Sequence, residues 1–456
     1  MNVAPDTWKD LPVTLVGMGR SAVGAAKLLQ HHGAAPFVTE LSDVEALIPW
    51  RAELEASGIP FEVGGHTARA WATPSLVVMS PGVPVSIAPV VSLRERDVEV
   101  IGELELAFRF ATAPILAVTG TNGKTTVTEL LKHLIQACGH SVLLAGNNHT
   151  SFSAAVLDSV TPDYYVLEVS SYQLESVCTF RPWIGAILNV TPDHLGRHGT
   201  MENYGASKAR IFGNDGASAQ VAVLNADDSR VWSMETPRDT SRVGFSITSP
   251  VKNGLYSDGH DLWVDGDPVG ELPGALPGAH NRSNMLAALS MMHAGGFDLA
   301  CCVKALPDFP GVEHRLEAVG DYGDRTWIND SKSTNVDSLR VALESFDVPV
   351  TLIAGGQGKG SSYEALVPLV AHHVSHLVAY GAEGPVLVAA FKDVVATTVV
   401  PDMEAAVQSA HVVSDDGGTI LLSPGCASFD LYTNFEARGA HFKALVVAEA
   451  YQEIAP

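Results

Sequence analysis

One short segment constrains this chain more than any other, because an apolar strand enters a glycine-rich turn and continues as a helix. Ile115–Val118 is continuously apolar, the turn Gly120-Thr121-Asn122-Gly123-Lys124-Thr125-Thr126 follows, and Thr125–Ala137 has helical periodicity. In such a turn the backbone amides hold phosphates, the lysine supplies charge and the first hydroxyl of the helix binds Mg²⁺. The pattern lacks the first glycine of a full phosphate loop, since Val118 stands there. A helix start that only happens to contain Gly-Lys-Thr is the alternative.

The rest of the chain repeats the same kind of unit. Short apolar runs alternate with helical periodicity along most of the 456 residues, which is typical of parallel α/β structure. The expected strands are Val13–Val16, Pro36–Thr39, Leu76–Met79, Ile115–Val118, Tyr165–Val169, Ile184–Val190, Val221–Asn225, Thr326–Ile328, Thr351–Ala354, Leu377–Tyr380 and Thr419–Leu422. We predict an α/β chain of three domains at residues 1–104, 105–311 and 312–456, with a parallel sheet in the central domain.

Charge and cysteine content exclude several classes of protein. Asp and Glu number 51 against 28 Lys and Arg, a formal charge of -23, which disfavours binding to a phosphate backbone. Five cysteines without a CxxC pair argue against a disulfide framework and for a reducing compartment. The N-terminus lacks a secretory signal and no apolar run is long enough to cross a bilayer. We therefore expect a cytoplasmic protein that binds neither nucleic acid nor membrane.

A second glycine-rich turn lies near the N-terminus and is open to several interpretations. Gly17-Met18-Gly19-Arg20-Ser21-Ala22 follows an apolar strand and opens a helix, and Glu40 ends the next strand. This arrangement is typical of dinucleotide-binding folds, where glycines let the backbone approach a diphosphate. A nicotinamide or flavin cofactor, another nucleotide or diphosphate, and a merely structural turn all remain possible from these residues alone.

Acidic and imidazole side chains follow two further strands of the central domain. Glu168 ends the run Tyr165-Val166-Leu167, and Asp193 and His194 come after Ile187–Val190. Because ligands bind at the carboxyl edge of such sheets, Glu168 and His194 are candidates to hold Mg²⁺ beside a nucleotide. The central domain is therefore predicted to be a Mg-ATP site.

Several stretches resemble the Mur ligases, the ATP-dependent amide-forming enzymes of peptidoglycan synthesis. The turn Gly120–Thr126 is shared by several members and by folylpolyglutamate synthases, whereas four other stretches resemble the branch of the family that adds D-glutamate. These are Glu168-Val169-Ser170-Ser171-Tyr172-Gln173-Leu174-Glu175, Asn329-Asp330-Ser331-Lys332-Ser333-Thr334-Asn335, Gly355-Gly356-Gln357-Gly358-Lys359 and the run from Ser423 to Asp430. The match runs in order over nearly the whole chain.

The resemblance implies one reaction. ATP phosphorylates the alanyl carboxylate of UDP-N-acetylmuramoyl-L-alanine, and the amine of D-glutamate attacks the acyl phosphate to form an amide. It also implies a Rossmann-like first domain for the UDP part, a Rossmann-like third domain, two Mg²⁺ ions and a monomer. Lys208 matches a lysine that the family carbamylates with CO₂; without the family, an ordinary exposed helix lysine is the simpler reading.

The resemblance assigns roles residue by residue. The catalytic set is Lys124, His194, Lys208 and Lys332, and the metal ligands are Thr125, Glu168, His194 and carbamylated Lys208. The ATP contacts are Gly120, Thr121, Asn122, Gly123, Lys124, Thr125, Thr126, Asn281, Asn284, Arg315 and Asp330. The UDP-substrate contacts are Gly17, Gly19, Arg20, Ser21, Ser80, Pro81, Gly82 and Asn147, and those of D-glutamate are Thr334, Lys359, Ser428 and Phe435.

Five residues at three places depart from the family pattern. Asn148 and His149 follow Asn147 where relatives commonly have Ile-Gly, Leu41 and Ser42 follow Glu40 where many have Thr-Arg or Lys, and Gly196 replaces the usual Asp. Three alternatives are weighed against the D-glutamate ligase. They are another Mur or folyl ligase, an NAD-dependent oxidoreductase that uses the first turn, and a non-catalytic nucleotide-binding module.

Overall fold

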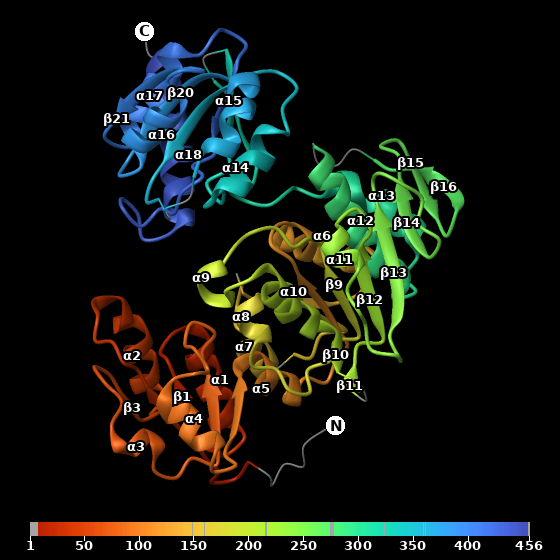
Figure 1. The fold of residues 1–456 in the computed structure, drawn as a ribbon, viewed down its shortest axis with the longest axis vertical. Helices are drawn as coiled ribbons and strands as arrows, with labels where there is room; N and C mark the ends of the chain where they lie inside the picture. Colours follow the sequence, from red (N-terminus) through yellow and green to blue (C-terminus); the bar gives the residue numbers. More distant parts are fainter. Residues whose placement is uncertain are drawn as a thin grey trace. The chain divides into compact units, whose positions relative to one another are not determined.

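The chain is an α/β protein with three sheet domains, as predicted. The computed structural model describes residues 8–147, 149–158, 160–214, 217–273, 278–322, 324–358, 360 and 362–454. The first and central domains form one compact unit and the third domain forms a second (Figure 1). No helix within these residues is both long and apolar enough to span a bilayer.

The first domain is built on a five-stranded parallel sheet. Its strand order is β3 (Phe61–Glu62), β2 (Ala35–Thr39), β1 (Pro12–Val16), β4 (Leu76–Met79) and β5 (Glu99–Gly102). Its helices are α1 (Arg20–His31), α2 (Ile48–Ala56), α3 (Ala68–Trp71) and α4 (Ala88–Arg94), followed by α5 (Glu103–Phe110). The strand order reverses between β1 and β4, so the loops after these two strands meet at the point where such sheets bind ligands.

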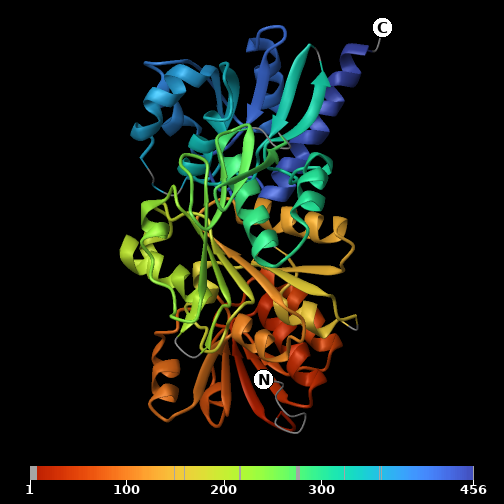
Figure 2. The ribbon, with the colours of Figure 1, turned by 90° about the vertical axis from the view of Figure 1, so that its right-hand side faces the viewer.

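The central domain has a nine-stranded mixed sheet. From one edge the order is β16 (Asp267–Glu271), β15 (Asp261–Val264), β14 (Gly254–Ser257), β13 (Ser241–Ser246), β12 (Val221–Asn225), β9 (Ile184–Ile187), β6 (Ile115–Thr119), β8 (Tyr164–Glu168) and β7 (Val142–Gly146). The predicted parallel arrangement is confirmed from β7 to β14, whereas β15 and β16 are antiparallel. Figure 2 shows these orange, yellow and green strands running side by side.

The helices of the central domain flank this sheet. They are α6 (Lys124–Ala137), α7 (Phe152–Leu157), α8 (Ser171–Leu174), α9 (Leu195–His198), α10 (Met201–Ala209), α11 (Ser229–Trp232), α12 (Ala279–Ala294) and α13 (Leu299–Ala305); β10 (Gly213–Asn214) and β11 (Ala217–Ser218) pair apart from the large sheet. The apolar side of α6 is fully buried through Val127, Leu130, Leu131 and Leu134. Burial of this face fixes the helix, and therefore its first residues, against the sheet.

Buried carboxylates join the first and central domains within their unit. Glu105 on α5 accepts the backbone N–H groups of Cys178, Thr179 and Phe180, each at 2.9 Å. Glu103 accepts the N–H of Ser153 at 2.6 Å. Two acids with buried hydrogen bonds therefore set the position of α5 against the central domain.

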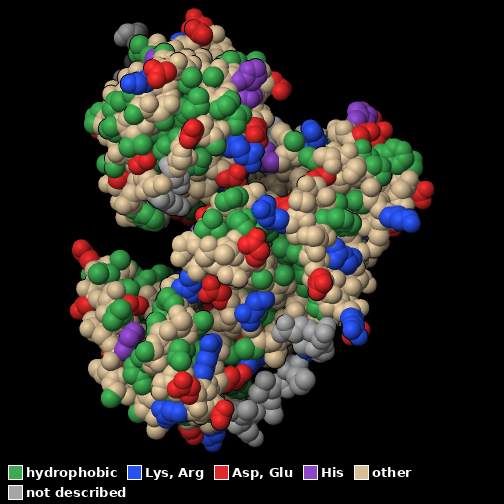
Figure 3. Space-filling view, viewed as in Figure 1, with side chains coloured by type: hydrophobic (Ala, Val, Ile, Leu, Met, Phe, Trp, Pro, Cys, Tyr) green, Lys and Arg blue, Asp and Glu red, His purple; other side chains and the backbone are tan. Residues whose placement is uncertain are grey.

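The third domain contains a six-stranded sheet. The order is β17 (Glu317–Tyr322), β18 (Arg325–Asn329), β22 (Thr419–Leu422), β19 (Val350–Gly355), β20 (Val374–Tyr380) and β21 (Ala396–Val400), with only β17 antiparallel. Its helices are α14 (Val336–Leu343), α15 (Val367–His373), α16 (Gly384–Phe391), α17 (Met403–Val413) and α18 (Phe435–Ile454). The loops after β18, β22 and β19 leave one edge of the sheet together. Figure 3 shows acidic and basic side chains interspersed over the viewed face.

Candidate active site

The glycine-rich turn after β6 is held open by its own hydrogen bonds. Thr121 N–H donates to Asn189 O at 3.0 Å, and Asn122 N–H donates to Asn189 Oδ1 at 2.8 Å. Gly123, the residue before α6, has φ +86°, and a Cβ there would lie 2.4 Å from Asn284 Oδ1. This position therefore requires glycine, and it brings Asn284 of α12 against the turn. Asn281, one turn earlier on α12, is 4% exposed.

The first residues of α6 face the end of β8. Lys124 Nζ donates to Gly120 O at 2.9 Å and to Thr121 O at 2.7 Å, so its ammonium lies over the turn. Thr125 Oγ1 donates to Glu168 Oε2 at 2.8 Å, and Glu168 is fully buried. Thr126, the next residue, is 4% exposed. The structure thus brings the phosphate-binding turn and the predicted metal ligand Glu168 together.

The oxygen pair of Thr125 and Glu168 fits a magnesium ion. Two adjacent ligands of octahedral Mg²⁺, each about 2.1 Å from the ion, lie roughly 3 Å apart. The pair has that spacing at 2.8 Å, and both atoms are the hard oxygen donors that Mg²⁺ prefers. No group of three His, Cys, Asp or Glu side chains in the described part of the chain is arranged to hold a metal. Phosphate and water oxygens would therefore have to complete the coordination, as is usual for Mg²⁺.

Lys208 is buried, contrary to the simpler reading of it as an exposed helix lysine. The residue is 1% exposed on α10, its Nζ donates to Gly120 O at 2.8 Å, and it lies 4.4 Å from the centre of the Tyr204 ring. Burial, reinforced by the charge of Lys124, lowers the pKa of Lys208 well below its ordinary value. The amine is therefore uncharged far more often than a surface lysine, and it sits directly beside the phosphate-binding turn.

His194 adopts a backbone conformation that few residues other than glycine use. Its φ is 54° at the start of α9, and its N–H donates to Asp193 Oδ1 at 2.8 Å. The ring lies 5.0 Å from that of Tyr172, and the side chain is 43% exposed. The strained backbone turns His194 out of the loop that follows β9, on the same sheet edge as Glu168.

The glycine-rich turn after β1 packs against the loop after β4, because the strand order of the sheet reverses between these two strands. Gly17 has φ +96°, and a Cβ there would lie 2.8 Å from Ser80 Cβ. A Cβ at Gly19 or at Gly82 would meet no atom within 4 Å, so the backbone is open to a ligand at both positions. Ser80 Oγ is buried without a hydrogen-bond partner among the described residues, which leaves a donor for a ligand. The predicted contacts Ser21 and Pro81 are half-buried in the same two loops.

Two hydrogen bonds connect this turn to Glu168 through Asn147. Arg20 Nη2 donates to Asn147 O at 2.7 Å. Asn147 Nδ2 in turn donates to Glu168 Oε1 at 3.1 Å. The predicted UDP-substrate residues Arg20 and Asn147 are therefore adjacent to the predicted metal ligand. His149, one of the departures, places its Nε2 3.9 Å from Glu168 Oε2; Asn148 lies outside the described residues.

Glu40, at the end of β2, lies against the first glycine-rich turn. Its carboxylate accepts the N–H of Met18 at 2.8 Å and that of Ser42 at 2.9 Å. Both oxygens thus stabilise the glycine-rich turn and the start of the next loop.

A second polar cluster lies in the third domain at the end of β18. Asp330 is fully buried, accepts Ser423 Oγ–H at 2.9 Å and lies 3.7 Å from Arg315 Nη1. Burial raises the pKa of Asp330 to about 6, although Arg315 and the hydrogen bond from Ser423 act in the opposite direction. The predicted pair Arg315 and Asp330 is therefore a contact within the third domain.

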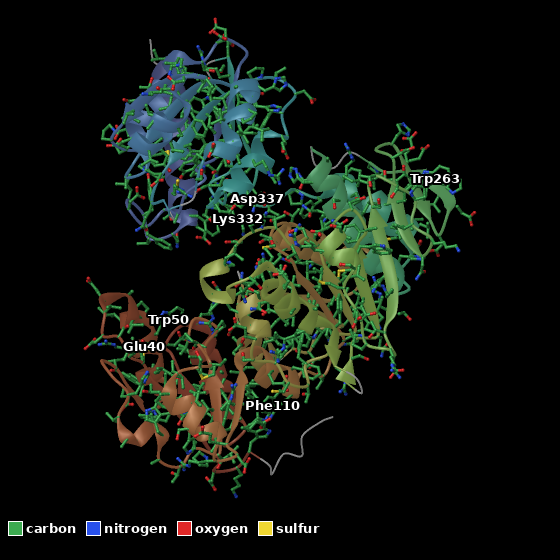
Figure 4. All side chains as sticks on the ribbon, in the orientation of Figure 1. Glu40, Trp50, Phe110, Trp263, Lys332 and Asp337 are labelled. Atoms are coloured by element: carbon green, nitrogen blue, oxygen red, sulfur yellow. The ribbon has the colours of Figure 1, made fainter. Side chains whose placement is uncertain are left out.

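Of the predicted D-glutamate residues, Phe435 lies near Lys332. Lys332 lies in the loop after β18 (Figure 4), and its Nζ is 5.0 Å from the centre of the Phe435 ring at the start of α18. Ser428 is 2% exposed, and its carbonyl accepts the N–H of Tyr432 at 2.8 Å. Thr334 is half-buried in the loop before α14. Lys359 lies outside the described residues, so its predicted role stays a prediction.

Arg438 is a residue that the sequence did not single out. It is fully buried, and it donates to Ser331 O at 2.7 Å, to Ser331 Oγ at 3.0 Å and to Cys426 O at 3.1 Å. It therefore ties together the loops that carry Lys332 and Ser428. One arginine on a weakly amphipathic helix gives no sequence signal of burial, because most arginines are exposed.

Family comparisons agree with this geometry. The sequence matches the description "Mur ligase MurD-like, N-terminal domain" over residues 12–102, "Mur ligase middle domain" over 118–292 and "Mur ligase, glutamate ligase domain" over 314–426.

The chain belongs to the Mur ligase family.

Two relatives are 38% identical to this member of the family, and both are named UDP-N-acetylmuramoylalanine–D-glutamate ligase. The protein of Geotalea uraniireducens aligns over 95% of this chain and 96% of its own length, and that of Alkaliphilus oremlandii over 96% and 98%. Thus whole chains correspond, not only the ATP-binding domain.

Solved structures support the fold. A UDP-N-acetylmuramate-alanine ligase of Thermotoga maritima has a TM-score of 0.62 at 19% identity, covering 98% of this chain and 100% of the other. The MurF ligase of Thermotoga maritima in complex with ADP has a TM-score of 0.62 at 15% identity, with coverage of 92% and 96%. At these identities the likeness establishes the three-domain architecture alone.

Proposed function

We propose that this Mur ligase adds D-glutamate to UDP-N-acetylmuramoyl-L-alanine with ATP, through an acyl phosphate, in the synthesis of peptidoglycan precursors. The observation that carries the proposal is the convergence of three elements at one sheet edge. These elements are the turn after β6, the buried Glu168 at the end of β8, and the buried Lys208 whose Nζ contacts Gly120. The choice of D-glutamate follows the two relatives that align over nearly the full chain.

The first step is phosphorylation of a carboxylate, which is otherwise a poor electrophile. The turn residues Gly120 to Gly123 would bind the ATP phosphates through backbone amides, and Lys124 would offset negative charge as the γ-phosphate moves. Asn281 and Asn284 would line the nucleotide pocket. Mg²⁺ held by Thr125 and Glu168 would supply Lewis-acid stabilisation of the phosphoryl group, with His194 a proposed ligand of a second ion.

We propose that Lys208 acts as a carbamate formed with CO₂. Only an uncharged amine adds to CO₂, and burial already favours that form here. The carbamate would carry a negative charge beside the turn, where Lys124 supplies the opposite charge. Burial of a charged lysine destabilises the folded state, whereas the carbamate of Lys208 would provide oxygen atoms that bind the metal ion.

We propose that each domain holds one substrate: residues 1–104 the UDP part, 105–311 ATP and 312–456 D-glutamate. In the first domain the open backbone at Gly19 and Gly82 and the buried Ser80 hydroxyl suit a diphosphate at the switch point. Arg20, Ser21, Pro81 and Asn147 would complete that site. Arg315 and Asp330 would contact ATP from the third domain.

We propose that the third domain supplies the separated donors that a dicarboxylate needs. Lys332 and Lys359 would supply charge, and Thr334, Ser428 and the Phe435 backbone would donate or orient hydrogen bonds to the two carboxylates. The protein is further proposed to be cytoplasmic, since ATP and UDP-linked precursors are cytoplasmic metabolites. We also propose that it works as a monomer, as the family resemblance implies. Light scattering of the purified chain tests the monomer directly.

A substrate panel tests the proposal. Phosphate release is measured with Mg-ATP and UDP-N-acetylmuramoyl-L-alanine in the presence of D-glutamate, L-glutamate, meso-diaminopimelate or L-lysine. We expect release with D-glutamate alone, matched by a new UDP-linked dipeptide. Release with a different amino acid would overturn the assignment of the third domain, and no release with any would favour a non-catalytic nucleotide-binding module.

A further inference from the structure

Three of the five cysteines gather away from the proposed active site, at the C-terminal end of α6. Cys138 follows the last residue of α6, and Cys301 and Cys302 lie on α13, which packs against α6. Cys138 Sγ is 3.3 Å from Cys301 Sγ and 3.7 Å from Cys302 Sγ. The structure holds all of the cysteines as free thiols.

The distance between Cys138 and Cys301, and the pocket that both residues line, would allow a disulfide to form between them. The sulfurs of a disulfide are about 2.0 Å apart, so Cys138 and Cys301 need to approach by only roughly 1 Å. Both residues line a surface pocket of about 330 Å³ together with His140, Tyr164 and Asp298. A small oxidant can therefore reach both sulfurs.

Cys302 is the poorer partner for the same reaction. It is fully buried and does not line the pocket, and burial raises the pKa of its thiol strongly. A buried thiol of raised pKa is rarely a thiolate, which is the reactive form. The shorter distance to Cys138 and the exposure to the pocket both favour Cys301 over Cys302 as the partner of Cys138.

We propose that Cys138 and Cys301 are a redox modification site, joined as an intrachain disulfide in the folded protein by a low-molecular-weight disulfide. The Cys301 thiolate attacks one sulfur of the small disulfide, which forms a mixed disulfide and releases one small thiol. The Cys138 thiolate then attacks the Cys301 sulfur and releases the second small thiol. The protein loses two hydrogens as protons and two electrons, and the small disulfide is reduced to two thiols.

The bond would join the end of the ATP-binding helix to α13. Helix α6 begins with Lys124 and Thr125, so the disulfide would fix the far end of the helix that carries the phosphate-binding residues. It would also close a long loop of the unfolded chain, between residues 138 and 301, which stabilises the folded state. Burial raises the pKa of Cys138, so this thiol reacts second, once the mixed disulfide lies beside it.

The experiment uses the full chain carrying Cys178→Ser as the parent. This exposed cysteine is replaced because trypsin leaves Cys138 and Cys178 in one peptide beginning at His133. The parent is incubated with glutathione disulfide, free thiols are alkylated, and peptides are mapped by mass spectrometry without reduction. The same treatment is applied to Cys138→Ser, Cys301→Ser and Cys302→Ser in that background.

We expect a cross-link between the His133 peptide and the peptide of residues 283–304, assigned by fragmentation to Cys301 and reversed by dithiothreitol. It should persist in the Cys302→Ser variant and disappear in the other two. The melting temperature of the oxidised parent should rise by about 2–5 °C, and that of the Cys301→Ser variant should not. A cross-link through Cys302, glutathione adducts without a cross-link, or an unmodified chain would each overturn the proposal.

Discussion

Replacement of the buried Asp330 by asparagine should change how the stability of the third domain depends on pH. The pKa of Asp330 is raised from its ordinary 3.8 to about 6 by burial, against the opposing effects of Arg315 and Ser423. At about 1.4 kcal/mol per pH unit, ionisation of the folded carboxyl then costs about 3 kcal/mol of stability above pH 6. Because the folded state binds this proton more tightly, the free energy of unfolding falls as pH rises from about 4 to about 6.

The assay is hydrogen exchange of peptides from β18 and β22, measured in urea series at pH 4.5 to 7.5 for wild type and Asp330→Asn. Over that range wild type should lose about 2 kcal/mol relative to the variant, with little further change above pH 7. The exposed Asp393→Asn, in the same domain, serves as the matched control and should track wild type. A wild-type and Asp330→Asn difference that is constant with pH, or that has the opposite sign, would refute the reasoning.

Three further perturbations test other parts of the site. Lys208→Ala should reduce turnover by at least about 10³-fold, and short carboxylic acids added to the assay should restore part of it. The exposed Lys252→Ala control should lose no activity, and the absence of rescue in Lys208→Ala would remove support for the carbamate. Gly17→Ala should destabilise the first domain by about 1–3 kcal/mol in urea unfolding, because of its φ of +96° and its approach to Ser80, whereas Gly19→Ala should not. Arg438→Met should lower the free energy of unfolding of the third domain by about 3–5 kcal/mol, since it leaves buried carbonyls without donors, and a loss below about 1 kcal/mol would contradict that role.

Much of the architecture follows from local sequence patterns. Apolar runs such as Leu76–Met79 and Thr419–Leu422 became strands with the same bounds, because fully buried parallel strands are continuously apolar. The antiparallel strands β15 and β16 were not predicted. The segment Asp267–Glu271 is entirely exposed and contains Pro268 and Gly270, so it lacks both the apolar content and the alternation that indicate a strand.

Some features of the candidate site could likewise be predicted from the sequence, and others could not. The approach of Thr125 to Glu168 could be predicted, because strand ends of a parallel sheet converge on one edge. The burial of Lys208 could not, since a lysine on a weakly amphipathic helix gives no local sign of its neighbours. Arg438 was missed for that reason, and Glu40 was ambiguous because only the structure shows which backbone amides its carboxylate accepts.

The most direct test of the account follows an oxygen atom. UDP-N-acetylmuramoyl-L-alanine labelled with ¹⁸O at both oxygens of the alanyl carboxylate is incubated with the protein, Mg-ATP and D-glutamate, and the released phosphate is analysed by mass spectrometry. If ATP phosphorylates that carboxylate and the amine then displaces phosphate, each phosphate released must carry one ¹⁸O atom. Unlabelled phosphate released together with the dipeptide product would contradict the acyl-phosphate route, and with it the role proposed for the phosphate-binding turn and Lys208.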